Sequence, residues 1–83
     1  MTFEVYMLKK AKKKLDKFPD AERIKEKLKT LENFPNVKDV IKIEDNVYRI
    51  RIGDYRALFK VYEGEKIIII VDVDVRGRIY KHL

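Results

Sequence analysis

Hydrophobic residues in the first part of the chain recur every three or four positions, with charged residues between them. The apolar positions that follow this spacing are Leu8, Ala11, Leu15, Phe18, Ala21, Ile24, Leu28 and Leu31. Such spacing predicts amphipathic helices. Pro19 interrupts the pattern and Asp20 is a favourable N-cap residue. We therefore expect two helices, over residues 9–18 and 21–33, that form a helical hairpin.

Aromatic and β-branched residues predict strands on both sides of the helices. The expected strands cover residues 3–8, 37–44, 47–52, 55–62 and 66–75. The order β-α-α-β-β-β-β predicts an α+β fold. An N-terminal strand and the helical hairpin precede a four-strand antiparallel meander, in one sheet with the helices on one face. The length suits a single domain over residues 1–83.

A two-residue loop at Gly53-Asp54 predicts that Arg51 lies opposite Arg56 in a hairpin. One face of this hairpin suits contact with the helices and carries Tyr48, Ile50, Ile52, Tyr55, Ala57, Phe59 and Val61. The other face, which we call the basic face, carries Arg49, Arg51, Arg56, Leu58, Lys60 and Tyr62. We expect Phe3, Tyr48, Tyr55 and Phe59 in the core.

The last strand joins the hairpin through residues 63–65, taken here as a three-residue loop. Arg56 then opposes Asp72. On this register Ile67, Ile69, Val71 and Val73 join the core face, and Ile68, Ile70, Asp72, Asp74 and Arg76 join the basic face. A slip by one residue would exchange the two faces, because side chains alternate along a strand.

The clustered arginines allow two interpretations. Like charges directly across a strand pair cost a few tenths of a kcal/mol, up to about 1, and the planar guanidinium binds phosphate through two parallel hydrogen bonds. The cluster therefore predicts a site for a strongly negative ligand, where Tyr62 or Tyr80 could stack a base or donate a proton. The alternative is an ion-pair network with Asp72, Asp74 and Glu44 on a solvated surface.

The charge balance points to a negatively charged partner. The net charge is +6 and the pI is about 9.6, which suits nucleic acid or an acidic protein. The longest apolar run, residues 67–71, is too short to span a bilayer, and no signal peptide precedes the first strand. We expect a cytoplasmic protein with no membrane partner.

Composition excludes several kinds of chemistry. The chain has no cysteine and no serine, so a disulfide, a zinc–thiolate site and a serine or cysteine nucleophile are all excluded. No His, Asp or Glu cluster has metal-ligand spacing, and the three glycines are too scattered for a phosphate loop. We expect neither a metal nor a small-molecule cofactor. We interpret the lysines of residues 9–14 mainly as a solvated helix face and His82 as a surface residue.

The string YRIRIGDYRALFKV, the hydrophobic last strand and the closing RGRIY resemble the RelE/ParE superfamily of bacterial and archaeal toxins. The element order, the proline between the helices and the LENFP that ends the second helix agree with this resemblance, which covers essentially the whole chain. For the RelE branch, the resemblance implies a small ribonuclease that cuts messenger RNA in the ribosomal A site. It also implies a cognate RelB-like antitoxin as a partner.

The resemblance also implies roles for individual residues. The positions that match the family's catalytic pattern are Arg49, Arg51, Arg56, Arg76 and Tyr80, and further RNA contacts are expected from Lys60, Arg78, Lys10 and Lys13. The implied reaction is attack of the nucleotide's own 2′-hydroxyl on the adjacent phosphate. Arginine suits the stabilisation of the extra phosphorane charge, and tyrosine suits general acid catalysis.

The chain also departs from the family pattern. Val75 stands where many members have a histidine, and Asp72 and Asp74 add negative charge near the expected phosphate site. Two alternative functions therefore remain beside that of a ribonuclease. One is a ParE-like toxin that poisons DNA gyrase without nuclease activity. The other is an inactive relative that only binds RNA or protein.

Overall fold

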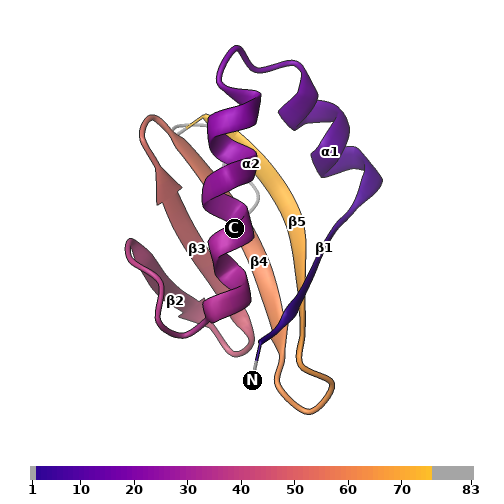
Figure 1. The fold of residues 1–83 in the computed structure, drawn as a ribbon, viewed down its shortest axis with the longest axis vertical. Helices are drawn as coiled ribbons and strands as arrows, with labels where there is room; N and C mark the ends of the chain where they lie inside the picture. The colour runs from indigo at the N-terminus through magenta and orange to yellow at the C-terminus, as the bar shows by residue number, and fades with distance from the viewer. Residues whose placement is uncertain (1, 76–83) are drawn as a thin grey trace.

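A computed structural model describes residues 2–75 and confirms the α+β class (Figure 1). The strands form one five-stranded sheet in the order β1-β5-β4-β3-β2, in which only β1 and β5 run parallel. In Figure 1, α2 crosses the front of the sheet and α1 lies beside the upper part of β5. The elements are β1 (Glu4–Met7), α1 (Lys9–Asp16), α2 (Ala21–Lys29), the 3-10 helix η1 (Thr30–Asn33), β2 (Val40–Glu44), β3 (Val47–Ile52), β4 (Tyr55–Tyr62) and β5 (Ile67–Val75).

The helices are shorter than the hydrophobic spacing predicts. α1 ends at Asp16, and the expected second helix divides into α2 and η1. Asp20 occupies the N-cap position of α2, but its side chain makes no capping hydrogen bond. Its carboxylate instead lies 3.5 Å from Nη2 of Arg23. No helix within residues 2–75 is long and apolar enough to cross a membrane.

The core lies between the helices and one face of the sheet. The predicted core residues Phe3, Tyr55 and Phe59 are buried, and Tyr48 packs against them while partly buried. Phe34, which the sequence pattern assigned only to the end of the second helix, lies at the centre of this aromatic cluster. Its ring centroid is 5.7 Å from that of Phe3, 5.0 Å from Tyr48 and 6.0 Å from Phe59. Edge-to-face contacts of this kind are favourable because ring edges and ring faces carry opposite partial charges.

The pairing of β3 with β4 follows the predicted register. Ile52 pairs with Tyr55, Arg51 with Arg56 and Ile50 with Ala57. Gly53 begins the turn with a φ of 60°, a backbone conformation that only glycine adopts without steric cost. The basic face of the hairpin is therefore turned away from α2, as predicted.

The predicted register of β5 is wrong, and two local features explain the error. The loop after β4 has four residues rather than three, because Tyr62 pairs with Ile67. This shift buries Ile68 and Ile70 in the core and removes Ile67 and Ile69 from it.

A β-bulge near Val71 then adds a second shift. Leu58 pairs with Asp72 although its neighbour Phe59 pairs with Ile70, so Val71 is the additional residue and does not belong to the core. Arg56 consequently pairs with Asp74 and not with Asp72. Since two shifts of one residue restore the alternation, Val73 still faces the core, and Asp72 and Asp74 still lie on the basic face.

The two glycines of the turns offer a matched test of this geometry. Gly53→Ala should lower the free energy of unfolding by about 1 kcal/mol, because a Cβ is unfavourable at positive φ. The new Cβ would also lie 3.0 Å from Nη2 of Arg23. Gly64→Ala should change it little, because no heavy atom of the described residues, apart from its chain neighbours, lies within 4 Å of that Cβ. Urea denaturation of both variants measures the difference, and equal effects would contradict the assigned turn conformation.

Candidate nucleic-acid interface

The basic face carries its charges in rows that cross the sheet. In the first row, Arg51 of β3 pairs with Arg56 of β4, which pairs with Asp74 of β5. In the second row, Arg49 pairs with Leu58, which pairs with Asp72. The structure therefore brings the three predicted arginines onto one face, with both aspartates on the adjacent strand.

Arg56 is the most enclosed of these arginines, with only 6% of its surface exposed. Its Nη1 donates hydrogen bonds to the carbonyl oxygens of Gly53, at 3.1 Å, and Tyr55, at 3.0 Å. Its Nε is buried and has no hydrogen-bond partner within residues 2–75. A buried donor without a partner on a charged group destabilises the fold. A hydrogen-bond acceptor that reaches this nitrogen would therefore bind favourably.

Arg51 and Arg49 are more accessible. The Arg51 side chain is 61% exposed, and its Nη2 lies 3.7 Å from Oδ1 of Asp39. An exposed ion pair of this length contributes little to stability and leaves the guanidinium available to a ligand. Arg49 is half-buried.

The predicted RNA-contacting lysines lie on two elements. Lys60 is exposed on β4, on the same face as the arginines, whereas Lys10 and Lys13 are exposed on α1. Arg76, Arg78, Tyr80 and His82 lie outside the described residues.

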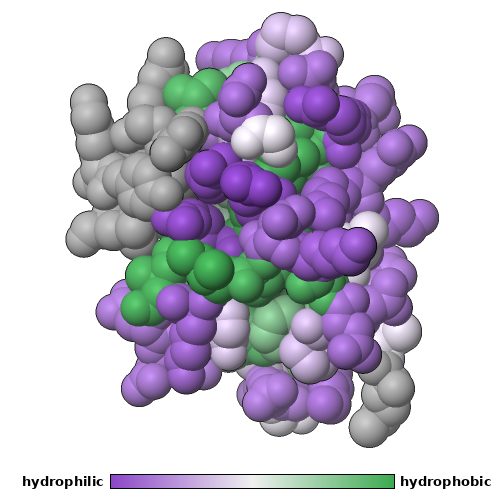
Figure 2. Space-filling view, turned by 90° about the vertical axis from the view of Figure 1, so that its left-hand side faces the viewer, coloured by the Kyte–Doolittle hydropathy of each residue, from purple (hydrophilic) through white to green (hydrophobic). Residues whose placement is uncertain are grey.

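The basic face also exposes large hydrophobic side chains, and the sequence pattern had placed only Tyr62 of these on it. Tyr6 is 51% exposed, Ile41 49% and Tyr62 38%. Ile41 pairs with Arg49, and Tyr6 pairs with Ile69, so both residues share this face. Figure 2, seen from the side that carries β2 and β3, shows hydrophobic residues reaching the surface between hydrophilic areas. Exposed apolar side chains therefore share cross-sheet rows with charged ones, since Ile41 lies beside Arg49 and Tyr6 lies in the row of Lys60.

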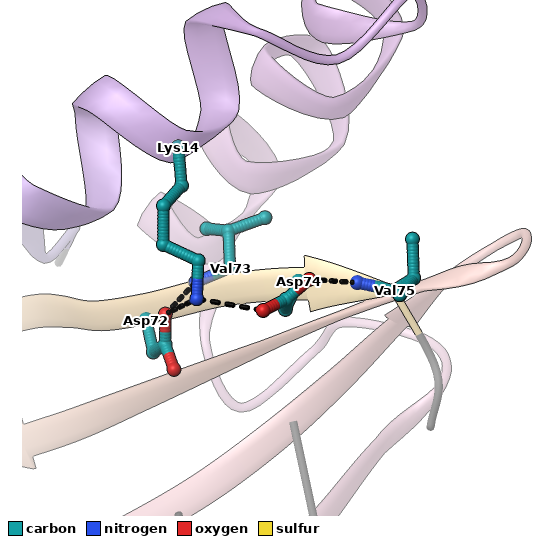
Figure 3. Close-up of polar contacts among 5 residues, drawn as sticks. All are labelled: Lys14, Asp72, Val73, Asp74 and Val75. Carbon is teal, nitrogen blue, oxygen red and sulfur yellow. Dashed lines mark hydrogen bonds and ion pairs between the residues drawn. The ribbon is translucent and has the colours of Figure 1, made fainter. Parts of the chain in front are cut away.

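Lys14 of α1 binds both aspartates of β5 (Figure 3). Its Nζ lies 2.8 Å from Oδ1 of Asp72 and 2.7 Å from Oδ2 of Asp74. The same Oδ1 of Asp72 accepts a hydrogen bond from the N–H of Val73, and Oδ1 of Asp74 accepts one from the N–H of Val75. Burial alone would lower the pKa of Lys14, but hydrogen bonds and charge attraction from the two carboxylates outweigh burial and raise it.

A cavity of about 330 Å³ lies beside this cluster. Lys14, Lys17, Phe18 and Asp74 line it. The Phe18 ring packs on Tyr55, with 4.9 Å between the centroids. The cavity thus adjoins the strand ends that carry Arg56 and Asp74. Within residues 2–75, no group of three or more His, Asp or Glu side chains is placed to hold a metal ion.

The chain belongs to the ParE toxin family of type II toxin–antitoxin systems, whose family model matches residues 5–80. Within this class it is a RelE-like toxin, as three relatives show. A curated Methanocaldococcus jannaschii protein, whose assigned name is toxin RelE1, is 34% identical over 99% of both chains.

Two solved structures agree with the computed one. The archaeal RelE–RelB complex from Pyrococcus horikoshii OT3 contains a chain with a TM-score of 0.81 and 37% identity, covering 94% of this chain and 99% of that chain. The RelB–RelE antitoxin–toxin complex from Methanococcus jannaschii gives a TM-score of 0.75 and 32% identity, over 94% of this chain and 98% of that one. The resemblance to the RelE/ParE superfamily is therefore confirmed.

The Lys14 ion pairs predict a specific loss of stability. Lys14→Met leaves two largely buried carboxylates without their shared cation, and should lower the free energy of unfolding by about 2 kcal/mol. This is less than the 3–5 kcal/mol of a fully buried pair, because the Lys14 side chain is 35% exposed. Lys12→Met is the control on the same helix. Its partner Asp16 is well exposed, so no measurable change is expected.

The ion pairs of Lys14 also predict how the stability of the protein changes at alkaline pH. Because the folded pKa of Lys14 is raised, its stabilisation is complete below the ordinary lysine value of 10.5 and disappears as pH rises through the folded pKa. The stability difference between the wild type and Lys14→Met should therefore stay constant near neutral pH and shrink above about pH 10.5. A difference that persisted unchanged at pH 12 would contradict this assignment.

Proposed function

We propose that this chain is a ribosome-dependent endoribonuclease that inhibits translation by cutting messenger RNA in the ribosomal A site. The observation that carries the proposal is the pairing of Arg51 with Arg56 across β3 and β4. This pairing places like charges side by side, which opposes folding. Bound phosphate would offset that repulsion, since two guanidinium groups can share its oxygens. The relatives named RelE support the same reading.

The proposed chemistry follows from the requirements of 2′-hydroxyl attack on the adjacent phosphate. Arg56 and Arg76 stabilise the additional negative charge of the phosphorane, because a guanidinium stays protonated and binds two oxygens. Arg49 and Arg51 orient the RNA backbone. As the bond from the 2′-oxygen to phosphorus forms, the bond to the 5′-oxygen breaks. The proton of the 2′-hydroxyl passes to solvent, and Tyr80 protonates the leaving 5′-oxygen as general acid. Neither a metal nor a cofactor is required by this reaction.

The burial of Arg56 adds a requirement to this mechanism. With 6% of its surface exposed, its guanidinium meets a phosphate only after the groups that cover it move. Its buried Nε, which has no acceptor among the residues that the structure describes, then gains one. In the proposed mechanism, RNA bound first by the exposed Arg51 and Lys60 would supply the free energy for this rearrangement.

We also propose a RelB-like antitoxin as the protein partner. The two archaeal relatives with the same fold were solved as complexes of RelE with RelB. The net charge of +6 favours an acidic partner, and the exposed Tyr6, Ile41 and Tyr62 offer apolar contact area on the basic face.

A second candidate function is a gyrase poison of the ParE type. The observation that favours it is the family model itself, which is described for the ParE toxin of type II toxin–antitoxin systems. The two functions share one scaffold, so the target has to be identified by the cellular lesion. The third reading, a relative that binds RNA or protein without cleaving, predicts binding without either lesion.

Expression without the antitoxin should arrest growth and produce messenger RNA cut within codons on ribosomes. Arg56→Lys should reduce the cleavage rate by about 10²–10³, because lysine retains the charge and loses the two-pronged contact. Primer extension on ribosome-bound messages measures the cuts, and circular dichroism verifies the fold. Lys29→Ala is the control, because this exposed lysine lies on α2, in the layer that covers the other face of the sheet. Growth arrest with intact messages and gyrase-dependent DNA breaks would refute the ribonuclease and establish the ParE-type function.

Affinity for RNA should fall as salt rises, because bound lysines and arginines release counterions from phosphate. Arg51→Ala should reduce the slope of log affinity against log salt by about 1. Lys10→Ala and Lys13→Ala test whether α1 contributes in the same way. Fluorescence anisotropy with a single-stranded RNA oligonucleotide measures these slopes, and an affinity that did not depend on salt would exclude phosphate contacts by the basic face.

A further inference from the structure

The net positive charge of the chain is concentrated in and next to α1. Residues 9–17 contain six lysines and one aspartate, a net charge of +5, whereas the whole chain has a net charge of +6. The remaining residues together therefore contribute a net charge of only +1. Since α1 lies beside the upper part of β5 (Figure 1), it forms a positive surface apart from the arginines of β3 and β4.

The packing of α1 determines which of its lysines face outward. Ala11 and Leu15 are fully buried in the core, and Lys14 reaches from the helix to the carboxylates of β5 (Figure 3). With 3.6 residues per turn, the side opposite the buried residues carries side chains spaced by three or four positions. Its exposed lysines, which we call the lysine row, are Lys9, Lys10, Lys13 and Lys17. The spacing extends to Lys17 because this C-cap residue has helical backbone angles.

No carboxylate within residues 2–75 forms an ion pair with the lysine row. Asp16, the only acidic residue of α1, lies 3.2 Å from Nζ of Lys12 and 3.2 Å from Nζ of Lys25. Like charges three or four residues apart oppose helix formation. Lys9 also begins the first turn, which contains no acidic residue and where the helix dipole disfavours cations. The lysine row therefore works against the stability of α1, which indicates that an anion from outside the chain binds there.

The chemistry of the lysine row excludes several kinds of partner. The centre of a protein–protein interface is depleted in charged residues and depends on aromatic and apolar anchors, and the row offers none. A helix that binds a membrane surface inserts its apolar face, whereas Ala11 and Leu15 are buried in the core. A site for single-stranded nucleic acid combines cations with aromatic side chains that stack on bases, and residues 9–17 contain no aromatic residue.

The phosphate backbone of a double helix fits these properties. A helical rise of about 1.5 Å per residue places Lys9 and Lys17 about 12 Å apart along the axis. A nucleic-acid double helix carries a negative charge every few ångströms along its axis, so a row of this length meets several phosphates at once. Lysine presents a compact charge, and contacts to phosphate carry no direct sequence information.

We infer that the lysine row of α1 binds the phosphate backbone of double-helical RNA, independently of base sequence. The choice of RNA over DNA rests on the proposed function, because the lysine row and the basic face would then bind one kind of nucleic acid. The inference goes beyond that function, since it assigns a second RNA surface that does not take part in cleavage. The arginines of the basic face contact a single strand, and α1 contacts a duplex.

Two double variants of equal charge test the lysine row. Lys9→Gln/Lys13→Gln removes two of its cations, and Lys29→Gln/Lys38→Gln removes two exposed lysines outside α1. Fluorescence anisotropy with RNA duplexes of unrelated sequence measures the affinities. The α1 variant should bind each duplex about tenfold more weakly, with a slope of log affinity against log salt reduced by about 2, and the control should change the affinity by less than about threefold. Equal effects of the two variants would overturn the inference, because net charge alone would then explain binding.

A single-stranded RNA oligonucleotide separates the lysine row from the basic face. Lys9→Gln/Lys13→Gln should weaken duplex binding more than single-strand binding, whereas Arg51→Ala should do the reverse. An α1 variant that weakened both equally would overturn the assignment to a double helix. A wild type that bound a DNA duplex of the same sequence more tightly than the RNA duplex would overturn the assignment to RNA.

The fold of the α1 variant is verified by circular dichroism and urea denaturation. Glutamine has a helix propensity close to that of lysine, and the substitutions remove like-charge repulsion, so the free energy of unfolding should not fall. None of these binding measurements involves the ribosome or cleavage. A chain that binds duplexes through α1 but leaves messages intact refutes only the ribonuclease. A chain that cuts messages while its α1 variant binds duplexes as the wild type does refutes only this inference.

Discussion

The bulge of β5 at Val71 is the constraint on which both faces of the sheet depend. Before it, Ile68 and Ile70 face the core, and after it Asp72 and Asp74 lie on the opposite face while Val73 stays in the core. A regular strand would continue the alternation of Ile68 and Ile70 and direct both carboxylates into the apolar core. Since an unpaired charge buried among hydrocarbon costs several kcal/mol, the bulge is what lets one strand serve both as the centre of the core and as part of the charged face.

The carboxylates that the bulge moves out of the core remain largely enclosed, and this links the stability of the fold to the electrostatics of the site. Lys14 satisfies both of them at 2.8 and 2.7 Å. The same contacts attach α1 to β5. A buried ion pair contributes little net stability compared with apolar packing, so specificity of position is the better explanation of why these charges lie inside the molecule.

The arginine cluster allowed two interpretations, a site for a negative ligand and an ion-pair network, and each applies to different residues. Arg51 takes part in an exposed, long ion pair with Asp39, whereas Arg56 is buried and its hydrogen bonds go to backbone carbonyl oxygens. The acidic residues of β5 are engaged by a lysine from the helical layer. An ion-pair network and the proposed phosphate site are therefore compatible on the basic face. This division is compatible with a RelE-like toxin whose proposed ligand is the RNA backbone.

Local patterns in the sequence predicted most of the fold. Hydrophobic periodicity located both helices and all five strands, and Gly53-Asp54 determined that Arg51 pairs with Arg56, because side-chain spacing and turn chemistry act within a few residues. The register of β5 was not accessible in this way. The isoleucines of β5 form a continuous apolar run that suits either phase of alternation, so burial against the helices decided which of them face the core.

The contacts of Lys14 with Asp72 and Asp74 could not be predicted either, because these aspartates lie 58 and 60 residues from Lys14 in the chain. The sequence by itself determined which side chains share a hairpin. Only the tertiary structure decided how the helix and the last strand combine their charges, since that depends on contacts between segments whose packing no local pattern encodes.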